Sequence, residues 1–206
     1  LAKEIPERFY DVGIEEEHAV TFAAGLAAGG MKPFCNIYSS FSQRAYDQIL
    51  HDVALQELPV VLCLDRGGLV GEDGATHHGC YDMSAYRSIP GAVIAAPKDE
   101  LELKNMMYSA MLAETGPYII RYPRGYGEGV DWQSAEYQSL ESGKGEKVLD
   151  GTDVAVFAAG PFVYRALEAA QRLKGEKGWN PSIYNIRYIK PIDEDLVRKS
   201  CSDHKR

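Results

Sequence analysis

Three consecutive glutamates, Glu15, Glu16 and Glu17, stand just before an apolar, alanine-rich run that spans 19–30. Such a run predicts a helix that is buried on most sides, so a carboxylate at its start would be partly desolvated and suited to sharing a proton with a ligand. Neighbouring helical residues point about 100° apart, so the three carboxylates cannot all face one pocket. Helical spacing puts Glu17 on the more polar flank but does not choose between Glu15 and Glu16. Alternatively, all three only stabilise the positive end of the helix dipole.

Arg66 follows an apolar segment, 59–65, that is expected to be a buried strand. Open α/β sheets bind ligands at the carboxyl ends of their strands, and the planar guanidinium group of arginine suits phosphate oxygens. We therefore favour a functional role for Arg66 over that of an exposed charge at a strand end. Arg44 has a simpler interpretation as an ion-pair partner of Asp47, which lies three residues further along the same expected helix.

The segment 68–79, GLVGEDGATHHG, combines glycines with side chains that can bind ligands or exchange protons. Its glycines permit the backbone to approach a ligand closely. A metal site made by Asp73, His77 and His78 is disfavoured, because two adjacent histidines on a loop can hardly converge on one ion without further ligands. We therefore predict no metal ligands in this chain.

Short apolar runs alternate with stretches of helical period from Pro33 onward. Strands are predicted at 33–38, 59–65, 92–97 and 118–123, and the second is apolar almost throughout, as is typical of a parallel strand covered on both faces. A helix is expected over 45–57, and another should begin at Asp99 with Glu102 as its capping partner. The pattern predicts an α/β fold with a largely parallel sheet flanked by helices.

The alternation stops after residue 125 and resumes after residue 150. The interval is rich in glycine and polar residues, which predicts an interdomain linker at 126–150 between a first domain, 1–125, and a second, 151–206. Strands expected at 153–160 and 182–189, with a helix between them, begin another α/β unit. Two strands and one helix bury too little surface to form a complete domain, so we expect the second domain to be partial.

Composition excludes several classes of function. Among 206 residues, 22 Lys and Arg stand against 30 Asp and Glu, giving a net charge of -8. This balance argues against a nucleic-acid partner, since phosphate backbones bind concentrated basic faces. No stretch reaches the roughly 20 apolar residues of a membrane span and no signal segment opens the chain, so no membrane role is expected. The four cysteines lack the paired spacing of a zinc or disulfide framework, which fits a reducing cytoplasm, and Cys35 and Cys63 are expected to be small buried hydrophobic residues.

Four motifs occur in a fixed order: DVGIEEEHAVTFAAGLAAGG at 11–30, IYSSFSQRAYDQILHDVALQELPVV at 37–61, DRGGLVGEDGATHHG at 65–79 and RYPRG at 121–125. In this order they resemble the central, pyrimidine-binding domain of the 1-deoxy-D-xylulose-5-phosphate synthases, which are transketolase-like thiamine diphosphate enzymes. The match runs from about Arg8 to Gly125 and continues more loosely into a C-terminal domain. The combination of four separated motifs makes it specific.

The resemblance assigns the cofactor contacts to two residues. In the family the first motif reads Gly-Ile-Ala-Glu-Gln-His, which implies that Glu16 hydrogen-bonds the pyrimidine nitrogen of thiamine diphosphate and favours its imino form. This chain departs from the pattern, because Glu15 replaces a small residue and Glu17 replaces a glutamine. Phe41 matches the residue that stacks on the aminopyrimidine ring.

The resemblance assigns the substrate contacts to five further residues. Tyr38, Arg66 and Arg124 match positions that hold the phosphate of glyceraldehyde 3-phosphate. Asp73 and His77 match positions beside the reacting substrate, where His77 would act as a proton shuttle.

The resemblance implies a thiamine diphosphate-dependent transferase that condenses pyruvate with glyceraldehyde 3-phosphate and releases CO₂, the first step of the non-mevalonate isoprenoid pathway. It also implies a homodimer in which another domain, missing from this chain, holds the diphosphate and Mg²⁺, so that this chain alone would be inactive. Two alternatives remain. The β-subunit of a 2-oxo acid dehydrogenase E1 component has the same domain order, but it would not use a phosphate site. A noncatalytic dimerisation module would keep the fold without responding to the cofactor.

Overall fold

Four parallel strands form the centre of the larger sheet in the computed structural model, which describes residues 1–204. The sheet has the order β1-β2-β4-β3-β8, and its fifth strand, β8, runs antiparallel to β3. The strands are β1 (Phe34–Tyr38), β2 (Val61–Asp65), β3 (Val93–Ala95), β4 (Tyr118–Arg121) and β8 (Tyr188–Lys190). The predicted α/β fold with a largely parallel sheet is therefore confirmed.

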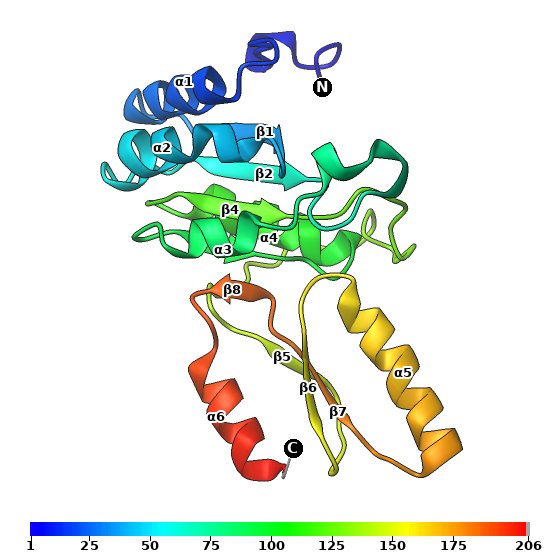
Figure 1. Cartoon of the computed structure of the whole chain (residues 1–206). Coiled ribbons are helices and arrows are strands. Elements are labelled where there is room, and N and C mark those ends of the chain that lie inside the picture. The colour runs from blue at the N-terminus through cyan, green and yellow to red at the C-terminus, as the bar shows by residue number, and fades with distance from the viewer. Residues whose placement is uncertain (205–206) are drawn as a thin grey trace.

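Helices cover both faces of this sheet (Figure 1). On β2, Leu62 and Leu64 pack into one core cluster while Val61 and Cys63 pack into the other, as the two-residue period of a strand requires. The first cluster lies against α1 (Glu16–Ala28), the π-helical turn Ile49–Ala54 and α3 (Asp82–Arg87), and the second lies against α4 (Glu100–Leu112). Cys35 and Cys63 are buried, as predicted. No helix in the described chain is both long enough and apolar enough to cross a lipid bilayer.

The helix expected over 45–57 is present in three different helical registers. A 3₁₀ turn, Ser42–Ala45, leads into α2 (Tyr46–Gln48), which continues as the π-helical turn Ile49–Ala54. Ala45, Ile49 and Val53 recur every fourth residue and are fully buried. The apolar spacing thus predicted the buried face correctly, whereas the hydrogen-bond register differs from that of a regular α-helix.

A smaller sheet follows in the C-terminal part of the chain (Figure 1). It has the order β5-β7-β6, made by β5 (Glu146–Leu149), β6 (Ala155–Ala158) and β7 (Ser182–Asn185). Helices α5 (Phe162–Lys177) and α6 (Glu194–Asp203) lie on opposite sides of these strands in Figure 1. Strand β5 falls inside the segment that we expected to be a linker. The sequence did not reveal this strand, because the residues that pair with β7 show no apolar period.

The single strand expected over 182–189 is two strands in two different sheets. The chain leaves β7 at Asn185, passes through Arg187 in the left-handed region (φ 51°), and enters β8 in the larger sheet. The Asn185 side chain accepts a hydrogen bond from the Arg187 N–H (3.1 Å) and donates one to Glu102 (2.9 Å). Arg187 in turn pairs with Glu102 of α4 at 2.7 Å. This polar junction ties the two sheets together.

Candidate functional site

The carboxyl ends of the parallel strands meet at one edge of the larger sheet. Tyr38 is the last residue of β1 and lies opposite Asp65, the last residue of β2. Arg66 follows β2 directly, and Arg124 lies three residues beyond the end of β4. The parallel order of the strands therefore gathers side chains that are far apart in the sequence, at the edge where open α/β sheets bind ligands.

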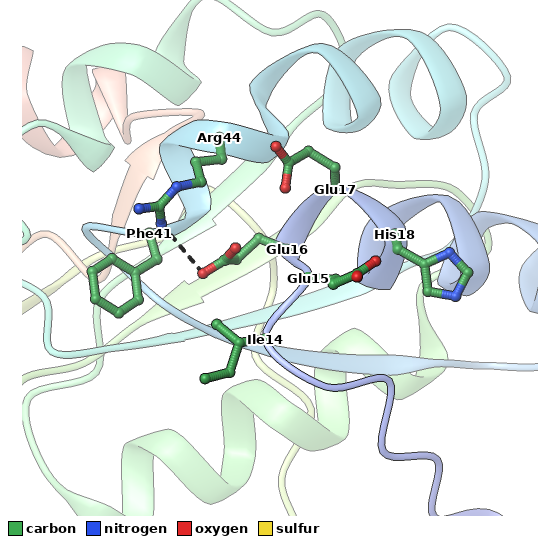
Figure 2. A pocket seen from close by; sticks show the side chains of 7 residues that line it. All are labelled: Ile14, Glu15, Glu16, Glu17, His18, Phe41 and Arg44. Atoms are coloured by element: carbon green, nitrogen blue, oxygen red, sulfur yellow. Dashed lines mark hydrogen bonds and ion pairs between the residues drawn. The ribbon is translucent and has the colours of Figure 1, made fainter.

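Glu16 is the only one of the three consecutive glutamates that is buried, whereas Glu15 and Glu17 are exposed. Glu15 is the N-cap residue of α1, and Glu16 is the first residue of the helix. Figure 2 shows the Glu16 side chain directed toward Arg44 and Phe41, while the other two glutamates extend in other directions. Of the three carboxylates, only that of Glu16 is therefore desolvated.

Arg44 pairs with Glu16, not with Asp47 as we expected from the sequence. The Arg44 guanidinium lies 3.4 Å from the Glu16 carboxylate, and its central carbon lies 5.1 Å from the centre of the Phe41 ring. This distance is within the range of a cation–π contact. The expectation failed because α1 packs against the segment that carries Arg44, which places a desolvated carboxylate within reach of the guanidinium group.

An open pocket of about 810 Å³ lies beside this ion pair. Figure 2 shows the residues that line it. Glu16 and Arg44 form its charged wall, and Phe41 and Ile14 form its apolar wall; Glu15, Glu17 and His18 complete the lining. The pocket therefore offers a buried carboxylate next to an aromatic face.

Aromatic contacts lead from the pocket toward the strand ends. The rings of Phe41 and Tyr38 stack with centroids 5.5 Å apart and an interplanar angle of 20°. His77 lies 5.0 Å from the Phe41 ring and 6.5 Å from the Tyr38 ring, measured between centroids. His77 is held by its own loop, where its Nδ1 pairs with the Thr76 hydroxyl at 2.9 Å.

The two arginines of the expected phosphate site share one carboxylate. Arg66 donates to Asp73 at 3.2 Å, and Arg124 lies 3.4 Å from the other oxygen of Asp73. Arg66 also pairs with Asp65 and lies 3.7 Å above the Tyr38 ring. Partial burial lowers the pKa of the Arg66 guanidinium, but its hydrogen bonds to Asp65 and Asp73 outweigh this effect. The net shift of the pKa is upward, so the group stays charged. The Asp65 and Asp73 carboxylates hold the two guanidinium groups in place and offset their charge, and this arginine cluster lies close to the pocket.

The contacts of His78 differ from those of the neighbouring His77. Its Nδ1 accepts a hydrogen bond from the Val70 N–H at 3.2 Å, which braces the loop 66–79 from within. Among residues 1–204, no group of three or more His, Cys, Asp or Glu side chains is arranged to hold a metal ion.

Seven residues singled out in the sequence form one connected group in the structure: Glu16, Tyr38, Phe41, Arg66, Asp73, His77 and Arg124. Arg44 connects the first of them to Phe41, and sequence reasoning missed this residue as part of the site. One signal was available, because Phe41 and Arg44 are three residues apart and would share a face of a helical turn.

Two family comparisons cover most of the chain. Residues 1–128 match the family described as "Transketolase, pyrimidine binding domain", and residues 143–206 match "Transketolase, C-terminal domain". The chain belongs to the transketolase family.

Curated relatives give a more specific comparison than the two family models. The chain is 53% identical over 199 residues to the 1-deoxy-D-xylulose-5-phosphate synthase of Bacteroides thetaiotaomicron, covering 97% of this chain and 31% of the relative. It is 54% identical over 201 residues to 1-deoxy-D-xylulose-5-phosphate synthase 1 of Geobacter sulfurreducens, covering 98% and 31%. The chain thus spans about a third of the length of these relatives.

Solved structures share the fold. A split-gene transketolase, described as an inactive beta4 tetramer, superposes with a TM-score of 0.86 at 29% identity, covering 98% of this chain and 65% of its own. A transketolase of Pichia stipitis in complex with sedoheptulose 7-phosphate gives a TM-score of 0.75 at 20% identity, covering 91% and 28%. The second similarity supports the fold alone.

The pocket fits the pyrimidine half of thiamine diphosphate, the cofactor that the family implies. In the described chain only the Oε1 atom of the Glu16 carboxylate has a side-chain partner, so acceptor positions remain for a ring nitrogen. The Phe41 ring supplies an aromatic face on which a flat heterocycle can stack. Both features lie on the same pocket.

Proposed function

We propose that this chain forms the pyrimidine-binding part of a 1-deoxy-D-xylulose-5-phosphate synthase, which joins pyruvate to glyceraldehyde 3-phosphate with loss of CO₂. One observation carries the proposal: the arginine cluster of Arg66 and Arg124 adjoins the pocket of Glu16 and Phe41 through the stacked Tyr38 ring. A phosphorylated substrate held at the cluster would lie next to a cofactor held in the pocket. The identity of about half to the curated synthases supports the same substrates.

Glu16 would hold a proton at the pyrimidine nitrogen. Thiamine diphosphate, when bound, supplies a carbon nucleophile for the keto group and an electron sink for decarboxylation. Because the Glu16 carboxylate is nearly buried, its hydrogen bond to the ring would face little competition from water. Arg44 would keep this carboxylate directed into the pocket through its ion pair.

Phe41 would orient the ring by stacking. Its own ring is held by stacking with Tyr38 and by the Arg44 guanidinium, whose central carbon lies 5.1 Å from the ring centre. A heterocycle that lies against it would have its nitrogen edge turned toward Glu16. Offset stacking of this kind contributes about 0.5–1.5 kcal/mol beyond the area that it buries.

Arg66 and Arg124 would bind the phosphate group of the aldose. Asp73 lies between the two guanidinium groups and orients both of them. The remaining N–H groups of each guanidinium are then available to phosphate oxygens, which arginine binds two at a time. Tyr38 supports Arg66 from below through its ring face.

His77 would move a proton at the reacting carbonyl. Its ring lies between the pocket and the arginine cluster, in contact with both Phe41 and Tyr38. An imidazole can both donate and accept protons near neutral pH. Asp73, on the same loop, would fix the position of the phosphate-binding arginines during this step.

Two further properties of the synthases are part of the proposal. Mg²⁺ and the diphosphate would be held by the diphosphate-binding domain of the complete enzyme, and the enzyme would be a homodimer in the cytoplasm. The split-gene transketolase whose structure is described as an inactive beta4 tetramer offers a precedent for an assembly of such chains without activity.

The test combines this chain with a separately produced diphosphate-binding domain, thiamine diphosphate and Mg²⁺. Consumption of pyruvate is followed with and without glyceraldehyde 3-phosphate. Consumption that requires the aldose phosphate supports the synthase. Consumption that needs a lipoyl acceptor instead identifies a 2-oxo acid dehydrogenase component. No consumption, with both parts folded and associated, identifies a noncatalytic module.

A further inference from the structure

A buried ion pair lies beneath the loop that carries Asp73 and His77. Arg121, the last residue of β4, donates from Nε to the Asp82 carboxylate at 2.7 Å. The two side chains are only 14% and 1% exposed. Asp82 also accepts hydrogen bonds from the Ser39 hydroxyl at 2.9 Å and from the Met83 N–H at 2.8 Å. Its charge is therefore fully compensated, as a buried carboxylate requires.

The same guanidinium group supports the base of the loop 66–79. Gly68 and Gly79 exchange two backbone hydrogen bonds, of 2.8 and 2.9 Å, which close the loop. Arg121 Nη2 reaches the Gly79 carbonyl at 3.5 Å. A Cβ atom on Gly67 would lie 2.7 Å from Nη2 of Arg121, so the loop rests on the guanidinium group with no space for a side chain.

The ion pair connects three segments that carry site residues. Ser39 lies between Tyr38 and Phe41 in the sequence, and Arg124 lies three residues beyond Arg121. Arg66 is the first residue of the loop and is held in the left-handed region at φ 59°.

We infer that Arg121 and Asp82 are positioning residues, which fix the loop 66–79 so that Asp73 and His77 meet Arg66, Arg124 and Phe41. The inference rests on the proposed function for the meaning of this geometry. Neither residue lines the pocket of Glu16 and Phe41. A buried pair is a costly way to stabilise a fold, since apolar residues of similar volume often do so equally well. Packing alone does not explain why this pair connects three segments that carry site residues, whereas a positioning role does.

The first test uses hydrogen–deuterium exchange of the whole chain without ligands. Arg121→Lys keeps the charge but loses the planar group that reaches both Asp82 and Gly79. Arg187→Lys is a matched control, because the Arg187–Glu102 pair has the same length, 2.7 Å, and similar exposures of 18% and 3% at the junction of the two sheets. We expect Arg121→Lys to accelerate exchange of the amides in 68–79 at least about tenfold, and Arg187→Lys to leave them unchanged. Equal effects of the two variants, or no effect of Arg121→Lys, would overturn the inference.

A second variant keeps the inference testable if Arg121→Lys fails to fold. Gly67→Ala leaves both charges in place and adds a methyl group where the end of the flexible Arg121 side chain lies. Gly67 does not have a positive φ, so its backbone accepts alanine without strain. Displacement of the guanidinium group should accelerate exchange of the amides in 70–79 as Arg121→Lys does. Unchanged exchange in Gly67→Ala would count against the inference.

The final measurement separates this inference from the proposed function. In the complex with the diphosphate-binding domain, Arg121→Lys should raise KM for glyceraldehyde 3-phosphate about tenfold, with KM for pyruvate unchanged. Fast loop exchange together with an unchanged KM for the aldose phosphate would overturn the positioning role. If the unmodified complex shows no activity while the loop responds to Arg121→Lys, the proposed function fails and the control of the loop by this pair stands.

Discussion

The Glu16 carboxylate and the Arg44 guanidinium form an ion pair at 3.4 Å in which only the carboxylate is buried. The side chain of Glu16 is 10% exposed, whereas that of Arg44 is 53% exposed. Arg44 therefore reaches in from the solvent side, and its guanidinium lies over the Phe41 ring. The pair joins the part of the site that would activate the cofactor to the part that would orient it.

Replacing Arg44 tests this connection. In Arg44→Gln the Glu16 carboxylate loses its charged partner and the Phe41 ring loses its cation, so both would be less firmly placed. We expect the rate of pyruvate consumption by the complex to fall about tenfold, since hydrogen bonds to charged groups contribute about 1.5–3 kcal/mol and this one is long. Arg165→Gln, which removes a surface pair with Glu168, is the control and should have no effect. A wild-type rate in Arg44→Gln would contradict the account.

Replacing Arg124 tests the phosphate site. Arg124→Gln removes one of the two cations around Asp73 and leaves the pocket of Glu16 intact. We expect KM for glyceraldehyde 3-phosphate to rise about 10- to 100-fold with KM for pyruvate unchanged, which corresponds to the loss of one charged hydrogen bond. Steady-state kinetics with each substrate varied in turn makes the measurement, with Arg198→Gln of α6 as control. A parallel rise of both KM values would remove Arg124 from the phosphate site.

The sequence predicted elements better than it predicted junctions between them. Apolar runs predicted β1 to β4, and the signal is clearest in β2 and β4, because a parallel strand buried on both faces shows in its composition. The segment 182–189 reads as one strand by the same rule, yet Arg187 turns the chain from one sheet into the other. That turn depends on Glu102 in a distant helix, which no local pattern contains.

For the candidate site too, local sequence patterns predicted less than contacts between distant segments determine. The family resemblance named seven residues that lie together in the structure, whereas helical spacing alone left Glu15 and Glu16 as alternatives for the pocket. Burial distinguishes them, and burial is set by how α1 packs against the segment that follows β1. Arg44 was assigned to Asp47 for the same reason, since a local ion pair is the simplest interpretation when the long-range partner is unknown.

The four cysteines should differ in reactivity according to burial. Burial raises the pKa of Cys35 to about 11 and, together with Cys35 and Asp65, that of Cys63 to about 12. Both thiols then lack the thiolate form that reacts with alkylating agents at neutral pH. We expect iodoacetamide at pH 7.5 to label the exposed Cys80 and Cys201 in the folded protein, and all four residues in urea. Labelling of Cys35 or Cys63 at the same rate as Cys80, detected by peptide mass spectrometry, would disprove their burial.

The junction between the two sheets should weaken in acid. Burial raises the pKa of Glu146, but the charges of Lys98 and Arg187 outweigh it and hold the pKa below its ordinary value of 4.5. Ionised Glu146 therefore stabilises the fold above about pH 4.5, and this contribution is lost as the pH falls through the lowered pKa. We expect Glu146→Gln to unfold at lower urea concentration than the unmodified chain at pH 7, and the difference to shrink below pH 4.5.

The control for this measurement is Glu168→Gln, which removes an exposed carboxylate on α5. Its unfolding midpoint should follow that of the unmodified chain at every pH, since exposed pairs contribute little. A difference for Glu146→Gln that stays constant from pH 7 to pH 3 would show that the carboxylate does not act through its charge.

The most direct test of the central claim compares Glu16→Gln with Glu15→Gln in the complex with the diphosphate-binding domain, thiamine diphosphate and Mg²⁺. The rate at which the bound cofactor exchanges its reactive thiazolium proton with deuterium, followed by NMR after acid quench, reports activation before any substrate binds. We predict that Glu16→Gln slows this exchange by about 10²- to 10⁴-fold, the usual contribution of a positioned acid–base group, while Glu15→Gln stays within about threefold of the unmodified protein. Equal rates in both variants would show that the buried carboxylate beside Phe41 is not the activating group.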